Sequence, residues 1–213
     1  LIIIGQQMLK GVDSFTLMAI PFFVIAGGLM ESGGISKRIV NFARTIVGFV
    51  PGGLAVVTVV ASMIFAAMTG AGAATTAAVG GIMIPSMEEE GYDGGYASAV
   101  QAVGGIFGPL IPPSILMVLY GVASGESVGD MLMAGLIPGI FLGLIVIAVV
   151  IFQCIKKGYK GVGRFSLKTS VKSFGQAFWA ILAPIIILGG IYSGFFTPTE
   201  ASAVCCFYCL IIG

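Results

Sequence analysis

The spacing of charged residues is the feature that most constrains this chain. No charged side chain occurs in residues 14–30, 131–155 and 173–199, and each of these stretches suits one membrane helix, which needs about 20 apolar residues. Residues 45–87 and 94–125 are also uncharged, but they are too long for one simple span. The charge pattern therefore predicts an all-α polytopic membrane protein in which two spans have an unusual construction.

The composition supports this fold class and excludes several functions. Hydrophobic residues make up 58% of the 213-residue chain and charged residues 9%, whereas a soluble domain has about 25% charged residues. The net charge of +1 argues against nucleic-acid binding, and the absence of histidine removes Ser–His and Cys–His catalysis. We therefore predict that the protein is not an enzyme and needs no cofactor, and that the Cys206–Cys209 pair packs as apolar residues. The chain begins without Met and ends in an apolar run, so we expect a fragment of a longer protein.

Basic residues predict the orientation of the spans. One basic group lies within residues 37–44 and a second within residues 156–172, and the positive-inside rule places both in the cytoplasm. The segment 94–155 between them makes two crossings. Both groups can then be cytoplasmic only if residues 52–87 enter the membrane and return to the same side, which predicts a re-entrant hairpin.

The predicted hairpin has a break at its centre. Residues 69–76 read TGAGAATT, and glycine weakens a helix. We expect a second arm of residues 76–87, which at about 18 Å is too short to cross the membrane. Such a tip offers backbone carbonyls, N–H groups and threonine hydroxyls to a ligand. The alternative interpretation is a close contact between helices rich in Gly and Ala.

A second break lies in residues 108–114, which read GPLIPPS. Pro112 and Pro113 remove two backbone donors and disfavour helix in the residues before them. We predict a broken transmembrane helix over 94–123, with residues 108–114 unwound. The unwound carbonyls suit Na⁺, and the helix that begins near Ser114 offers N–H groups to an anion. The alternatives are a simple proline kink and a Ser114 that only caps the helix.

The other segments are assigned from pattern and order. Residues 31–50 carry apolar residues at spacings of three and four and basic residues on the other side, which predicts an amphipathic arm helix in the membrane interface. An ordinary surface helix is the alternative. Transmembrane helices are expected at 14–30, 131–155, 174–196 and, cut short, 198–213, with a cytoplasmic basic loop at 156–172.

A capping box is predicted at residues 197–200, which read TPTE. Thr197 suits the N-cap, Pro198 the first helical position, and Glu200 the position that reaches back to the cap. This pattern assigns Thr197 and Glu200 a structural role. A functional membrane acid at Glu200 is the alternative.

Several stretches carry a resemblance to a known family, in the family's order along nearly the whole chain. The sequence resembles the large membrane (permease) subunit of tripartite ATP-independent periplasmic (TRAP) transporters. The matching stretches are PFFVIAGGLMESGGISKRIVNFA at 21–43, FAAMTGAGAATTAAVGGIMIP at 65–85, GY at 91–92, GPLIPPSI at 108–115, AGLIPG at 134–139 and GFFTPTEASAV at 194–204.

This resemblance implies an elevator-type secondary transporter in the bacterial inner (cytoplasmic) membrane. Such a permease imports an organic anion, often a C4-dicarboxylate or a sugar acid, by symport with Na⁺ as the coupling ion. A periplasmic substrate-binding protein delivers the substrate, and a small four-helix membrane subunit completes the complex. Family members look like inverted repeats, so the chain would hold the first half of one.

The resemblance also implies site residues, position by position. The family's hairpin tip usually reads like S-G-S-S-x-A-T, and Ala71 and Gly72 stand here in place of two hydroxyl residues, which leaves carbonyl coordination possible. Backbone coordination of Na⁺ is implied for Thr69, Gly70, Gly108, Ile111 and Pro112. The implied substrate- and ion-binding set is Thr69, Gly70, Ala71, Gly72, Thr75, Gly108, Pro109, Ile111, Pro112, Pro113 and Ser114.

Other functions are weighed against transport. Another ion-coupled anion transporter of the same superfamily and a non-transporting membrane scaffold are the main alternatives. A channel would need a continuous polar path, whereas two helix breaks favour an occluded site. An intramembrane enzyme would need acids or a basic partner inside a span, and the uncharged intervals hold neither.

Overall fold

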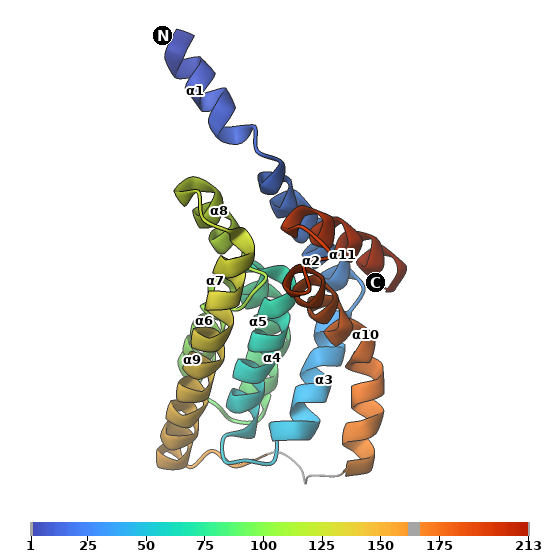
Figure 1. Ribbon diagram of the computed structural model, residues 1–213. Coiled ribbons are helices and arrows are strands. Elements are labelled where there is room, and N and C mark those ends of the chain that lie inside the picture. Colours follow the sequence, from blue (N-terminus) through green and yellow to red (C-terminus); the bar gives the residue numbers. More distant parts are fainter. Residues whose placement is uncertain (1, 162–166, 213) are drawn as a thin grey trace.

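A computed structural model of the protein describes residues 2–161 and 167–212 (Figure 1). Within these ranges every regular element is a helix. The elements are α1 (Ile2–Val12), the 3-10 helix η1 (Phe15–Met18), α2 (Ala19–Ser32), α3 (Ile35–Val47), α4 (Gly53–Thr69), α5 (Gly72–Glu89), α6 (Gly94–Gly105), α7 (Phe107–Leu110), α8 (Ile115–Ser124), α9 (Val128–Lys157), α10 (Leu167–Tyr192) and α11 (Pro198–Ile212).

Within the described residues, four segments are long and apolar enough to cross a membrane. They lie where the charge spacing predicts spans, at Phe15–Ser32, Gly94–Ser124, Val128–Lys157 and Ser170–Tyr192.

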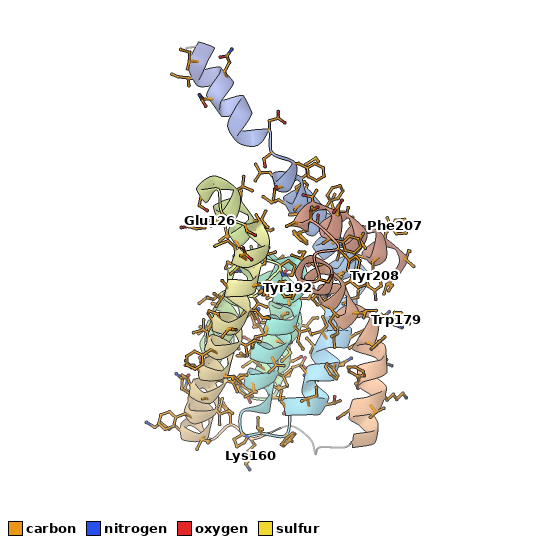
Figure 2. All side chains as sticks on the ribbon, in the orientation of Figure 1. Glu126, Lys160, Trp179, Tyr192, Phe207 and Tyr208 are labelled. Atoms are coloured by element: carbon orange, nitrogen blue, oxygen red, sulfur yellow. The ribbon has the colours of Figure 1, made fainter. Side chains whose placement is uncertain are left out.

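The exposed surface of these segments suits lipid contact. On α9, Ile137, Phe141 and Leu144 are all exposed, and large apolar side chains gathered on a surface indicate contact with lipid or another protein. Figure 2 shows Glu126 and Lys160 at opposite ends of the helix bundle. The protein is thus an all-α polytopic membrane protein.

Local sequence sets the limits of α9. Ser127 caps the first turn and accepts a hydrogen bond from the Asp130 N–H at 3.3 Å, and Gly158 ends the helix with a φ of +76°. The helix therefore extends beyond the predicted span at both ends and includes the first residues of the predicted loop 156–172. The last residues of that loop belong to α10, and residues 162–166 lie outside the described part of the chain.

Helices α4 and α5 form a helical hairpin joined only by Gly70 and Ala71. The prediction that the second arm begins at Thr76 is wrong, because the helix already begins at Gly72. Gly72 is followed by two alanines, the best helix formers, and the first turn packs against another helix. The arms have 17 and 18 residues, so the expected short second arm does not exist. A re-entrant position in the membrane stays a prediction.

The predicted broken helix is present as α6, α7 and α8. Its unwound part is shorter than predicted, because residues 107–110 still form a helical turn and only residues 111–114 are unwound. Pro109 is tolerated in α7 because the first turn of a helix needs no internal donor. Ser114 then caps α8.

The helices form two groups that meet along α4. In the first group α2 packs on α11 and α3 on α10, whereas α5, α6, α7 and α9 pack around α4. Figure 1 shows α3 beside α4, and these two helices connect the groups. Helix α4 is buried along nearly its whole length, which suits a helix that is apolar on all sides. In the first group, the Tyr208 hydroxyl of α11 donates to the Trp179 carbonyl of α10 at 2.7 Å (Figure 2).

Helix α3 occupies the central part of the predicted arm 31–50. Its buried residues include Ile35, Ile39 and Ala43, and the helix packs against α10 and α4. The basic residues of α3 are exposed, as expected for an amphipathic helix. Its position at a membrane interface stays a prediction.

The capping box at the start of α11 forms in the structure. The Thr197 N–H donates to Glu200 Oε2 at 2.8 Å, and the Glu200 N–H donates to Thr197 Oγ1 at 3.3 Å. Pro198 is the first residue of the helix. These reciprocal bonds satisfy two backbone donors that would otherwise lack partners.

Replacing Thr197 with Ala should destabilise this helix start. The Glu200 N–H loses its acceptor, so we expect a loss of about 1 kcal/mol, measured as a lower unfolding temperature of the full-length protein in detergent. Ser98→Ala, which alters an exposed hydroxyl on α6, is the control. Equal unfolding temperatures for the two variants would contradict the capping role.

Candidate functional site

The hairpin tip and the unwound segment touch each other directly. Gly70 ends α4 with a φ of +62°, a conformation that glycine adopts without penalty. Its carbonyl accepts a hydrogen bond from the Ile115 N–H, the first residue of α8, at 3.3 Å. A Cβ at Gly70 would overlap the Pro113 carbonyl oxygen. Glycine is therefore required here both for the turn and for the contact.

The first turn of α5 lies equally close to the end of α6. A Cβ on Gly72 would stand 2.6 Å from the Gly105 carbonyl oxygen. A Cβ on Gly108 would overlap the backbone nitrogen of Gly72, and one on Gly105 would overlap the Thr76 hydroxyl. The hairpin and the broken helix thus pack backbone against backbone, which brings both breaks to one place.

The buried threonine hydroxyls of the tip are occupied within the hairpin. Thr69 Oγ1 and Thr75 Oγ1 lie 3.2 Å apart, and both residues are buried. Thr75 Oγ1 also donates to the Ala71 carbonyl at 2.9 Å, and Thr69 Oγ1 reaches the Phe65 carbonyl at 3.3 Å. Each hydroxyl has one donor proton, so these two side chains hold the shape of the tip.

The unwound segment presents free carbonyl oxygens. The carbonyls of Ile111, Pro112 and Pro113 accept no hydrogen bond from the described residues. In contrast, the Pro109 carbonyl accepts one from the Ser114 hydroxyl at 2.6 Å. Three consecutive unpaired carbonyls, of which that of Pro113 lies against Gly70 of the hairpin tip, suit a hard cation such as Na⁺. The described residues hold no cluster of His, Cys, Asp or Glu that could bind a metal through side chains.

Ser114 serves as a helix cap. Its side chain is fully buried, donates to Pro109 and accepts from the Met117 N–H at 3.4 Å. The predicted anion site at the start of α8 is weakened, because the Ile115 N–H is bonded to Gly70. The N-terminus of α5 is different, since Ala71 provides no side-chain cap there.

A cavity of about 400 Å³ opens where the two breaks meet. Its volume is in the range of small-ligand sites, roughly 300–1,000 Å³. The lining residues come from the tip, from α6 and α7, and from the start of α8: Gly70, Ala71, Gly72, Ala73, Thr76, Ala102, Gly105, Ile106, Pro109, Ile115 and Leu116.

The structure thus brings the predicted hairpin tip and the predicted unwound segment together. The predicted residues have different roles there. Gly70, Ala71, Gly72 and Pro109 line the cavity, whereas the other predicted residues do not. Among the predicted set, the buried residues without a place in the lining are Thr69, Thr75, Gly108, Ile111, Pro112, Pro113 and Ser114.

The predicted binding set omits two polar side chains that the structure places at the site. Thr76 lines the cavity, and Gln101 donates from α6 to the Thr75 carbonyl at 3.3 Å. Gln101 carries the only amide side chain in the uncharged interval 94–125. That isolated polar group was the signal that could have identified it.

Comparison with known proteins identifies the family of this chain. The family model for the tripartite ATP-independent periplasmic transporter, DctM component, matches residues 1–213. The chain therefore belongs to this family of TRAP transporter large permeases.

Named relatives are similar over nearly the whole chain. The sialic acid TRAP transporter large permease protein SiaM of Vibrio cholerae is 44% identical over 98% of this chain and 49% of its own length. The C4-dicarboxylate TRAP transporter large permease protein DctM of Pseudomonas aeruginosa is 45% identical over 92% of this chain and 46% of its own. The isethionate TRAP transporter permease protein DctMQ of Oleidesulfovibrio alaskensis is 44% identical over 99% of this chain and 33% of its own. The chain spans half or less of the length of these relatives, which are named as transporter permeases and not as enzymes.

Gly108→Ala should lower the stability of the protein, whereas Gly81→Ala should not. At Gly108 the new Cβ meets the Gly72 backbone, whereas at Gly81 it meets open space. We expect a lower unfolding temperature for Gly108→Ala in the full-length protein. Gly81→Ala should be neutral or stabilising by up to about 1 kcal/mol, because Ala favours a helix. A Gly108→Ala protein as stable as the wild type would contradict the backbone contact.

Proposed function

We propose that this chain forms one half of the transport site of a permease that imports an organic anion together with Na⁺. The observation that carries the proposal is the meeting of two helix breaks beside one cavity, with the carbonyls of Ile111, Pro112 and Pro113 unpaired among the described residues. Interrupted helices that offer carbonyls to a cation and N-termini to an anion are typical of secondary transporters.

Sodium would be bound by backbone oxygen in this site. The proposed ligands are the carbonyls of Thr69, Gly70, Gly108, Ile111 and Pro112. The Gly70 carbonyl has one bond from Ile115, and a carbonyl oxygen has a second lone pair for the ion. A site built from backbone is insensitive to the loss of hydroxyls at Ala71 and Gly72.

The organic anion would lie in the cavity at the start of α5. Gly72 and Ala73 line the cavity and form the first turn of this helix. Without a side-chain cap, the N–H groups of that turn are available to a carboxylate or sulfonate, and the helix dipole favours the negative charge. The relatives are named for sialic acid, C4-dicarboxylates and isethionate, which are organic anions.

The arrangement of helices supports an elevator mechanism. The group around α4 holds the proposed site, and the group of α2, α3, α10 and α11 lies beside it. We propose that the group around α4 moves against the group of α2, α3, α10 and α11 across the bacterial inner membrane. A periplasmic substrate-binding protein would deliver the anion, a small four-helix membrane subunit would complete the complex, and the remainder of the permease would close the site.

Uptake by the full-length permease tests this function. We expect proteoliposomes with the small subunit and the binding protein to accumulate one of sialic acid, a C4-dicarboxylate or isethionate when a Na⁺ gradient is applied. Gly70→Val should reduce uptake to background with normal membrane levels, because a β-branched residue is strongly disfavoured at this φ and its Cβ overlaps Pro113.

Gly81→Val is the matched control, since this glycine has open space around it. Wild-type uptake that is indifferent to Na⁺ would contradict sodium coupling. Undiminished uptake by Gly70→Val would remove the hairpin tip from the mechanism and favour a scaffold role for this chain.

A further inference from the structure

One polar side chain connects the hairpin to the broken helix below the tip. Gln101 of α6 is fully buried, and its amide nitrogen donates to the carbonyls of Thr75 and Thr76 on α5 at 3.3 and 3.4 Å. A Cβ on Gly80, one turn further along α5, would stand 2.9 Å from Gln101 Cγ. The Gln101 side chain therefore packs closely against α5.

The rest of this face of the broken helix consists of glycines. Gly104 and Gly105 follow Gln101 by three and four residues and precede Gly108 by four and three, so the four residues share one side of a helical path. The glycines carry no side-chain donor or acceptor, so they add no directional side-chain bonds to the hairpin. On this face only Gln101 makes directional side-chain bonds to the hairpin.

A contribution to protein stability does not explain why position 101 carries an amide side chain. Its NH₂ group faces two carbonyls, which fixes the orientation of the amide, and its Oε1 has no hydrogen-bond partner among the described residues. The Ser62 hydroxyl of α4, which lies against Gly104, is also buried without a partner there. Each unpaired polar atom of this kind costs about 1–3 kcal/mol. An apolar side chain of the same length would avoid that cost for Gln101.

We propose that Gln101 is a positioning residue that sets the register between the hairpin and the broken helix, and thereby the geometry of sodium binding at the tip. This inference rests on the proposed sodium coupling. The two carbonyls that Gln101 holds belong to Thr75 and Thr76, and the Thr75 hydroxyl contacts Thr69 in the tip.

Sodium coordination requires precise positions of the carbonyl oxygens, which explains why one positioning side chain matters. A shift of α5 by one residue moves its backbone by about 1.5 Å, whereas metal–oxygen distances tolerate only about 0.2 Å. Even a fraction of such a shift would move the hairpin tip relative to the unwound segment, where the Gly70 carbonyl accepts a hydrogen bond from the Ile115 N–H at 3.3 Å. Sodium affinity should therefore respond to Gln101, although this side chain does not contact the ion.

Sodium-dependent thermal stabilisation tests the proposal without knowledge of the substrate. The full-length permease with its small subunit is titrated with NaCl against choline chloride at constant ionic strength, and the unfolding temperature is followed. Gln101→Met keeps the length and removes the donors. We expect its apparent sodium affinity to fall by about three- to tenfold, the equivalent of one or two lost hydrogen bonds, with an unfolding temperature in choline equal to or above that of the wild type.

Gln153→Met is the matched control, because Gln153 is exposed on α9, and its sodium affinity should not change. If Gln101→Met does not fold, Gln101→Asn replaces it, since the shorter amide cannot reach both carbonyls. Absence of sodium stabilisation in the wild type contradicts sodium coupling itself. Clear wild-type stabilisation that the Gln101 variant retains in full, or loses no more than Gln153→Met does, overturns the positioning role alone.

Discussion

The close approach of two backbones is the constraint on which this structure depends. Gly70, Gly72, Gly105 and Gly108 lie where any Cβ would meet main-chain or side-chain atoms of the neighbouring segment. Their small size lets the hairpin tip reach the unwound segment and leaves carbonyl oxygens beside a cavity. A larger residue at any of these positions would separate the two breaks, and each break alone would be only an interrupted helix.

This constraint also explains which chemical groups form the proposed site. Buried Thr69, Thr75 and Ser114 use their hydroxyls for bonds within the protein, so the groups left for ligands are mainly main-chain oxygens and N–H groups. Main-chain groups are present whatever the side chain is. A transporter family can therefore vary the residues at the tip while the ion-binding backbone keeps its geometry, provided that the glycines preserve the contact.

Much of the fold follows from local sequence rules. Charge spacing located the spans, the proline pair located the break, and Thr197 with Glu200 located the start of α11. The errors occurred where packing overrode local preference. Helix α5 begins at Gly72 and not at Thr76, because its first turn is supported by α6, and the helix continues through Pro109 because that residue occupies a first turn, where a missing donor costs nothing.

The sequence by itself determined that the chain is a membrane protein of many helices and that two of its spans are interrupted, because solvation and backbone donors act locally along the chain. Only the tertiary structure decided that the interruptions meet, that the Thr69 and Thr75 hydroxyls are already occupied, and that Gln101 faces the hairpin. These features depend on which helix faces come together. That choice is made by packing between segments distant in sequence, and no spacing within one segment encodes it.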